Sequence, residues 1–157
     1  MTVPQFELLT ELKLIDPIRR KIDEAYVPND HPIVMASVDE DGRPVLSFRG
    51  STHVHSDTQI AVWARRSEGN TARALAKNPH VALIFREPNP AGGRSAAVIT
   101  MRGRARVVTD EAVRRKVYGS MPEVERTADP DCTGVAIIID LDSVTGFIPG
   151  YRLQMTR

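Results

Sequence analysis

Apolar and polar residues alternate along much of the chain, a two-residue period that is typical of β-strands. The pattern predicts strands at 33–39, 45–53, 58–65, 81–86, 96–108 and 134–141. Gly103 lies inside the longest of these strands, where it predicts a bulge or a close approach of another chain segment.

Shorter segments follow the helical period instead. Apolar residues at helical spacing predict two short helices within 4–26, so that residues 1–30 would form a helical N-terminal extension. Further helices are predicted at 71–77, at 110–118 and after a capping box formed by Ser120 and Glu123. We see no internal repeat and no linker. About six strands with short helices between them predict a mainly β fold, a closed or nearly closed antiparallel barrel in a single domain over 1–157.

The composition argues against several classes of function. Lys and Arg number 21 and Asp and Glu 20, so the formal net charge is only +1, and we expect no nucleic acid partner. The apolar run at 135–139 is far too short to cross a membrane, so no membrane partner is expected. Cys132 is the only cysteine, and the N-terminus shows no signal-peptide pattern. We therefore expect a cytoplasmic protein.

Side-chain alternation assigns faces to two of the predicted strands. If 45–53 and 58–65 form a hairpin-like pair, Leu46 and Phe48 point into the barrel together with Ile60 and Val62. The outer face would then carry Ser47, Arg49, Ser51, Trp63 and Arg65. Arginines beside hydroxyls and the only tryptophan suit a planar anionic ligand. The alternative is that the arginines are simply solvated and that Trp63 belongs to the core.

Two adjacent arginines follow the strand predicted at 58–65, in the stretch W-A-R-R-S-E-G-N-T. Arg65 and Arg66 precede Ser67, Asn70 and Thr71, where the next predicted helix begins. Guanidinium groups, hydroxyls and the free N–H groups of a helix start are all good ligands for phosphate. The junction is therefore predicted to bind an anion, with a solvated loop as the alternative.

Two other polar clusters are less specific. His53 and His55 have no third ligand at a useful spacing, so no metal site is predicted. Arg102, Arg104 and Arg106 share one strand face, which is either solvated or ion-paired, or in contact with a cofactor or a partner subunit.

Several motifs in a fixed order resemble a known family. They are D-G-R-P-V-L-S on the first hairpin, A-R-A-L-A-K-N-P-H-V-A-L-I-F around the helix at 71–77, and the later R-G-R-A-R-V-V. Over about 33–148 the chain resembles the FMN-binding split β-barrel proteins related to pyridoxamine 5′-phosphate oxidase. The resemblance implies a six-stranded antiparallel split β-barrel of Greek-key type. It also implies a homodimer with the cofactor at the interface.

The same resemblance implies where a flavin would bind. Its ring would lie beside Ser47, Phe48, Arg49, Gly50 and Ser51, its ribityl chain and phosphate beside Trp63, Ala64, Arg65, Arg66 and Ser67, and the helix start would contribute Asn70, Thr71 and Arg73. Thr71 stands where the family often has lysine, so either Arg65 or Arg66 would supply that charge. This departure leaves a deazaflavin open as an alternative to FMN.

The expected function is that of an FMN-binding oxidoreductase acting on a small molecule that the sequence does not identify. Arg49 is the residue expected to stabilise negative charge on the reduced ring. The short C-terminal segment after the last predicted strand argues against pyridoxamine phosphate as the substrate. Two alternatives are a deazaflavin-dependent reductase and a flavin-binding storage or sensing protein without efficient turnover.

Overall fold

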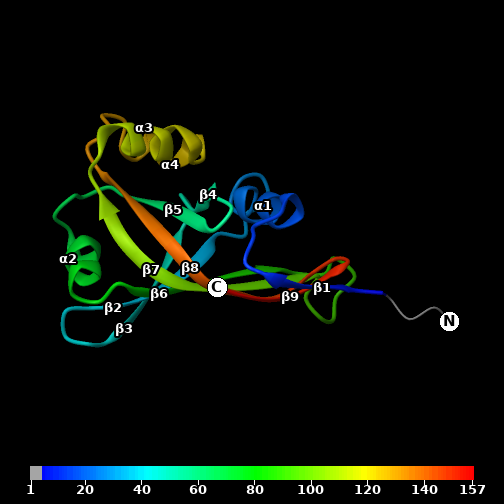
Figure 1. The fold of residues 1–157 in the computed structure, drawn as a ribbon. Coiled ribbons are helices and arrows are strands. Elements are labelled where there is room, and N and C mark those ends of the chain that lie inside the picture. The colour runs from blue at the N-terminus through cyan, green and yellow to red at the C-terminus, as the bar shows by residue number, and fades with distance from the viewer. Residues whose placement is uncertain (1–4) are drawn as a thin grey trace.

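We describe a computed structural model of the protein for residues 5–157 (Figure 1). Within this range, nine strands form one sheet. The strands are β1 (Glu7–Glu11), β2 (Ile33–Val38), β3 (Pro44–Arg49), β4 (His53–Ser56), β5 (Gln59–Ala64), β6 (His80–Glu87), β7 (Ala97–Val108), β8 (Val135–Ile148) and β9 (Tyr151–Thr156). The helices are α1 (Asp16–Asp23), α2 (Asn70–Lys77), α3 (Glu111–Ser120) and α4 (Glu123–Thr127).

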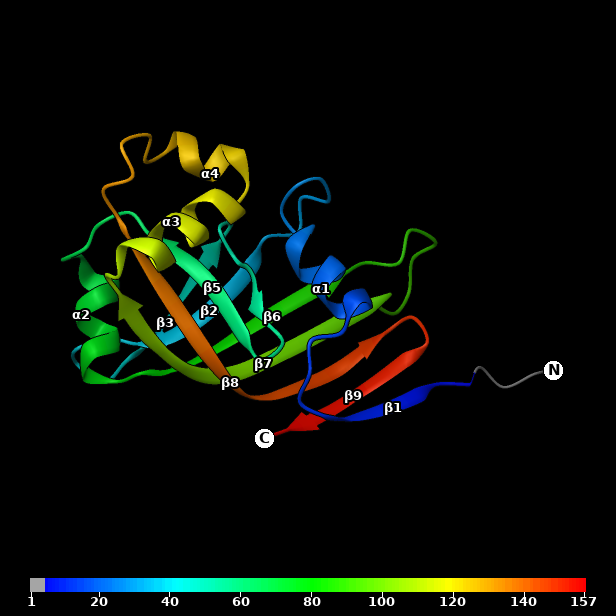
Figure 2. The same cartoon turned by 45° about the horizontal axis from the view of Figure 1, so that its top comes forward.

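The sheet runs in the order β1-β9-β8-β7-β6-β2-β3, with β5 added to β8 and β4 added to β5. Its pairs are antiparallel except for the parallel pair of β1 with β9. The long strands β7 and β8 curve strongly, so the sheet wraps around a core without closing (Figure 2). The predicted fold class, a mainly β split barrel with helical decorations, is confirmed. The sheet of the described residues has nine strands and one parallel pair, however, rather than six antiparallel strands. No helix of the described residues is long and apolar enough to span a membrane.

The buried apolar residues form two clusters. The larger fills the barrel, and one side of it is closed by Ile18 and Ile22 on α1 and by Leu14 just before that helix. The smaller lies under α3 and consists of Ala61, Trp63, Val117, Met121, Ala136 and Ile138. Because β5 and β8 contribute to both clusters, each is buried on both faces at its centre.

The bulge predicted at Gly103 is present, since the register of β7 against β8 shifts between Arg102 and Gly103. A Cβ on Gly103 would lie 2.3 Å from the carbonyl oxygen of Asp140, so only glycine fits this crossing. Two of the three arginines that share one face of β7 form ion pairs with β8, Arg104 with Asp142 and Arg106 with Asp140. The ion-paired interpretation therefore holds for these two arginines.

Two of the predicted elements are different in the structure. The first of the two predicted N-terminal helices is instead strand β1, because β9 offers it an edge to pair with. The capping box is also absent, since α4 begins after Pro122 and the Ser120 hydroxyl donates back to the carbonyl of Lys116.

The predicted hairpin-like pair of 45–53 and 58–65 is wrong. Strand β3 ends at Arg49 and pairs with β2, whereas β5 pairs with β4 and β8. Ile60 and Val62 are buried as predicted, but Leu46 and Phe48 are 72% and 74% exposed. They lie on the outer face of the sheet because the buried face of β2 is the one that carries Ile33 and Met35.

Candidate functional site: an arginine-lined pocket

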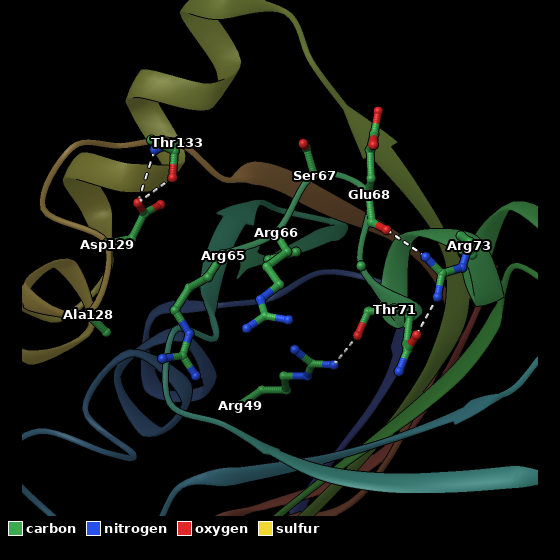
Figure 3. Close-up of a pocket in the computed structure, with 13 residues that line it drawn as sticks. Arg49, Arg65, Arg66, Ser67, Glu68, Thr71, Arg73, Ala128, Asp129 and Thr133 are labelled. Atoms are coloured by element: carbon green, nitrogen blue, oxygen red, sulfur yellow. Dashed lines mark hydrogen bonds between the residues drawn. The ribbon is translucent and has the colours of Figure 1, made fainter.

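The pocket forms where two paired strands separate. β5 and β8 stay in register as far as the pair Ala64 with Val135. Beyond this pair, β5 continues into residues 65–69 and α2, whereas the loop 128–134 leads into β8. Between them lies a pocket of about 1010 Å³ (Figure 3). It is lined by Arg49, Ala64, Arg65, Arg66, Ser67, Glu68, Gly69, Asn70, Thr71, Arg73, Ala128, Asp129 and Thr133.

Arg49 enters the pocket from the end of β3 and is held by two neutral partners. Its Nε donates to the Ser47 hydroxyl at 3.0 Å, and its Nη2 donates to the Thr71 hydroxyl at 3.0 Å. Burial lowers the pKa of Arg49, and the nearby charge of Arg65 lowers it further, while Glu125 acts in the opposite direction. A partly buried guanidinium beside another cation is favourable for a bound anion.

Arg65 and Arg66 follow β5 directly and are exposed. Figure 3 shows their guanidinium groups in the same space as that of Arg49, whereas the side chains of Ser67 and Glu68 point away from it. Within residues 5–157, neither arginine has a hydrogen bond or an ion pair from its side chain. Both are therefore free to form charge-assisted hydrogen bonds to a ligand.

The first turn of α2 forms the rest of the pocket wall that carries Arg65 and Arg66. Gly69 is the N-cap and offers no side-chain acceptor to the free N–H groups of the helix. Arg73 is already engaged, because it pairs with Glu40 at 2.9 Å and donates to the Asn70 side chain and the Glu68 carbonyl. Arg73 thus stabilises the loop before the helix rather than offering a free charge.

Asp129 forms the opposite wall and is almost fully buried. Its Oδ2 accepts hydrogen bonds from the indole N–H of Trp63 and the backbone N–H of Gly134, both at 2.9 Å. Its Oδ1 accepts from the Thr133 backbone N–H at 3.0 Å and from the Thr133 hydroxyl at 2.8 Å. Burial raises the pKa of Asp129, but these hydrogen bonds outweigh it and leave the pKa below its usual range.

The structure gathers many of the residues proposed from the sequence around this pocket. Those that line it are Arg49, Ala64, Arg65, Arg66, Ser67, Asn70, Thr71 and Arg73. Ser47 does not line it but supports Arg49. Phe48 points outward from the sheet, and Gly50 packs against Glu125 and Tyr26, where a Cβ would have no room.

Trp63 and Ser51 lie in the interior, so their predicted position on an outer face is wrong. Trp63 is 4% exposed and packs edge-on against Tyr118 with Arg114 over its ring. Its backbone N–H donates to the buried Ser51 hydroxyl at 2.9 Å. Because β5 is covered by α3, the face that carries Trp63 is a second core rather than a surface.

Sequence reasoning missed the wall contributed by Ala128, Asp129 and Thr133. The stretch A-D-P-D-C carries no periodicity, and its acidic residues are typical of a solvated loop. Nothing local distinguishes the buried Asp129 from the exposed Asp131.

Solved structures with the same fold come from several bacteria. One is an FMN-binding protein from Syntrophomonas wolfei, with a TM-score of 0.63, 8% identity and 82% of each chain covered. Another, from Lactobacillus delbrueckii, is a candidate pyridoxamine 5′-phosphate oxidase with a TM-score of 0.58, 18% identity and coverage of 87% of this chain and 96% of that one. HupZ of Group A Streptococcus has a TM-score of 0.57, 16% identity and coverage of 79% and 90%. At these identities the likeness shows the fold alone.

Sequence comparison shows the family. No curated protein gives a significant match to the chain. The family model described as pyridoxamine 5′-phosphate oxidase, however, matches residues 19–140, which is most of the chain. The protein therefore belongs to the pyridoxamine 5′-phosphate oxidase family.

Proposed function

We propose that the protein binds FMN, with the phosphate in the arginine-lined pocket, and acts as a flavin-dependent oxidoreductase on a small molecule. The observation that carries the proposal is the convergence of Arg49, Arg65 and Arg66. None of these guanidinium groups has an ion pair within residues 5–157, and they surround a space next to a helix start. The name of the Syntrophomonas wolfei neighbour supports the same ligand.

The donor set fits a phosphate monoester. A phosphate dianion accepts bidentate hydrogen bonds from guanidinium groups and single bonds from hydroxyl and backbone N–H groups. Arg65 and Arg66 supply the first kind, and the start of α2 supplies the second. Arg49, anchored to Ser47 and Thr71, is the residue we assign to negative charge that develops on the ligand, because its position is already fixed.

A bound flavin would supply the hydride or electron transfer, and the chain would supply binding and electrostatics. Four arginines line the pocket against the carboxylates of Glu68 and Asp129. The oxygens of Asp129 are engaged by four donors, so this carboxylate holds the wall and accepts no proton from a substrate. The side chain of Glu68 points away from the space that the arginines share (Figure 3), so we assign no general base among the described residues of the pocket.

The proposal includes a homodimer with the site near its interface. Leu46 and Phe48 on β3 and Ile84 on β6 are large, exposed and on one face of the sheet, since Val34 of β2 pairs with both Phe48 and Ile84. An exposed apolar face of this kind is a natural surface for a second copy. Phe48 precedes Arg49 directly, so the apolar face and the pocket lie at the same end of β3, on opposite faces of that strand.

The proposal is tested by identifying the small molecule that the purified protein releases on denaturation, using mass spectrometry. FMN in the extract, together with bleaching of the yellow protein by NAD(P)H and turnover with an electron acceptor, is the expected result. A deazaflavin in the extract would favour the other cofactor, for which a neutral Thr71 and a wide pocket are suited. Tight flavin without turnover would support a storage or sensing role. A protein that neither retains nor binds any flavin would refute the proposal.

A further inference from the structure

The Asp129 carboxylate bridges the two walls of the arginine-lined pocket. On one side, Oδ2 holds the indole of Trp63, which is the penultimate residue of β5 and lies just before Ala64, Arg65 and Arg66. On the other side, the two oxygens hold Thr133 and Gly134 in the loop that leads into β8. The bridge lies at the point where β5 and β8 stop pairing.

We propose that Asp129 is a positioning residue for the anion site, holding the segment that carries Arg65 and Arg66 at a fixed distance from the opposite wall. The inference rests on the proposed function in so far as the anion is the phosphate of FMN. Without the bridge, the two segments would be held less firmly beyond Ala64 and Val135, and ordering them on a ligand would cost more conformational entropy.

The surroundings of Trp63 reinforce this assignment. Tyr118 packs edge-on against the indole at 5.4 Å, and the Arg114 guanidinium lies over it at 5.7 Å. Arg114 in turn donates to the carbonyl oxygens of Cys132 and Gly134. The indole and the loop 128–134 are therefore held together by two polar groups, Asp129 and Arg114, on different elements.

The bridge needs a carboxylate in this place. All of the partners of Asp129 are donors, so an amide would set its own N–H₂ group against one pair of them. Gly134 shows how close the fit is, because a Cβ there would lie 2.2 Å from the Ala64 carbonyl oxygen and 2.7 Å from the indole nitrogen.

Charge and position predict opposite effects for the substitution Asp129→Asn. Removing a negative charge beside an arginine pocket would, by Coulomb attraction alone, tighten the binding of an anion. If Asp129 is a positioning residue, the same substitution weakens binding although the pocket becomes more positive. Asp131→Asn is the matched control, because Asp131 is an exposed carboxylate of the same loop that accepts no hydrogen bond within the described residues.

The test is calorimetric titration of the full-length protein with FMN, riboflavin and inorganic pyrophosphate. We expect Asp129→Asn to bind FMN and pyrophosphate about tenfold more weakly, riboflavin to change little, and Asp131→Asn to bind all three as the parent does. Trp63→Phe, which keeps an aromatic ring but removes the indole donor, is a milder second variant and should lose about threefold for the anions.

The inference would be overturned if Asp129→Asn bound anions as tightly as the parent or more tightly, or if it lost FMN and riboflavin affinity equally. If Asp129→Asn does not fold, an unchanged anion affinity in Trp63→Phe would overturn it instead. If the parent binds pyrophosphate but not FMN, the proposed function fails and the pyrophosphate series alone decides the role of Asp129. If the parent binds neither, both ideas fail.

Discussion

Arg49 on β3 donates a hydrogen bond of 3.0 Å to the hydroxyl of Thr71 in the first turn of α2. In the chain, β4 and β5 lie between these two elements, and this contact fixes the guanidinium of Arg49 at the edge of the pocket. Thr71 stands where the resemblance to the family implies that a lysine is often found. In this protein the charge near that position comes from another strand, and the threonine is its acceptor.

Thr71→Val, which keeps the shape but removes the acceptor, should weaken FMN binding by roughly 2–10-fold, because a hydrogen bond contributes about 0.5–1.5 kcal/mol. Thr71→Lys should bring no gain, since its ammonium group would lie beside the Arg49 guanidinium. Titration with FMN measures both. Thr127→Val, which removes an exposed hydroxyl on α4, is the control. An unchanged affinity in Thr71→Val, or a clear gain in Thr71→Lys, would show that Arg49 does not depend on this contact.

Arg65→Ala and Arg66→Ala should each weaken FMN binding, and one of them should dominate. The loss of a charge-assisted bond to phosphate costs roughly 1.5–3 kcal/mol, or about 10- to 100-fold in affinity. Riboflavin lacks the phosphate, so its weaker binding should not respond to the dominant substitution. Arg94→Ala, in the exposed loop before β7, is the matched control. Parallel losses for FMN and riboflavin would mean that neither arginine contacts phosphate.

Much of the sheet could be predicted because alternation is a local signal. Strands β2, β5, β6 and β7 lie close to their predicted bounds for this reason. Strand β1 could not be recognised, since its pairing with β9 joins the two ends of the chain and its apolar residues also fit a helix. The break of 45–53 into β3 and β4 was missed because an exposed apolar face, as on β3, alternates in the same way as a buried one.

The pocket was predictable only on one side. Arg65, Arg66, Asn70 and Thr71 are close in sequence, so their shared position at a strand end follows from local pattern. Asp129 comes from a segment more than fifty residues later, and its role arises from donors that only the tertiary structure brings to it. A sequence shows the residue but not its partners.

Phe48→Glu should convert the proposed dimer into a monomer, because it places a charge on the exposed apolar face that Leu46, Phe48 and Ile84 form. Light scattering at micromolar concentration measures the mass. Val124→Glu, which changes an apolar residue of α4 that is 48% exposed, is the control and should leave the dimer intact. If the flavin lies at the interface, the monomeric variant should also lose it. A parent protein with the mass of one chain would contradict the dimer directly.

His53 should make the fold less stable as the pH falls below neutrality. It is 4% exposed, with Nδ1 at 2.8 Å from the Ser51 carbonyl oxygen, and its Nε2 is buried without a partner among the described residues. Burial lowers the pKa of His53; the hydrogen bond to Ser51 and the charge of Asp23 oppose this, and Lys116 adds to it. The folded protein therefore binds the proton less readily than the unfolded chain does.

This difference in pKa sets the sign and the pH range of the effect. The stabilisation is complete above the unfolded pKa of about 6.5 and declines as the pH falls through and below it, by up to about 1.4 kcal/mol per pH unit. Burial also lowers the pKa of His55, which adds a contribution of the same sign. Asp129, whose pKa is lowered, loses its contribution only at more acid pH, near and below about 4. The range from pH 7 to 5 thus isolates the histidines.

Urea unfolding at pH 7.5, 6.5 and 5.5 measures the effect. His53→Asn can still donate to the Ser51 carbonyl but cannot take up a proton, so its free energy of unfolding should vary less with pH than that of the parent, even if it is lower throughout. His80→Asn, at an exposed position at the start of β6, should keep the pH dependence of the parent. If the parent and His53→Asn lose stability in parallel between pH 7.5 and 5.5, then the buried imidazole is not the group that titrates.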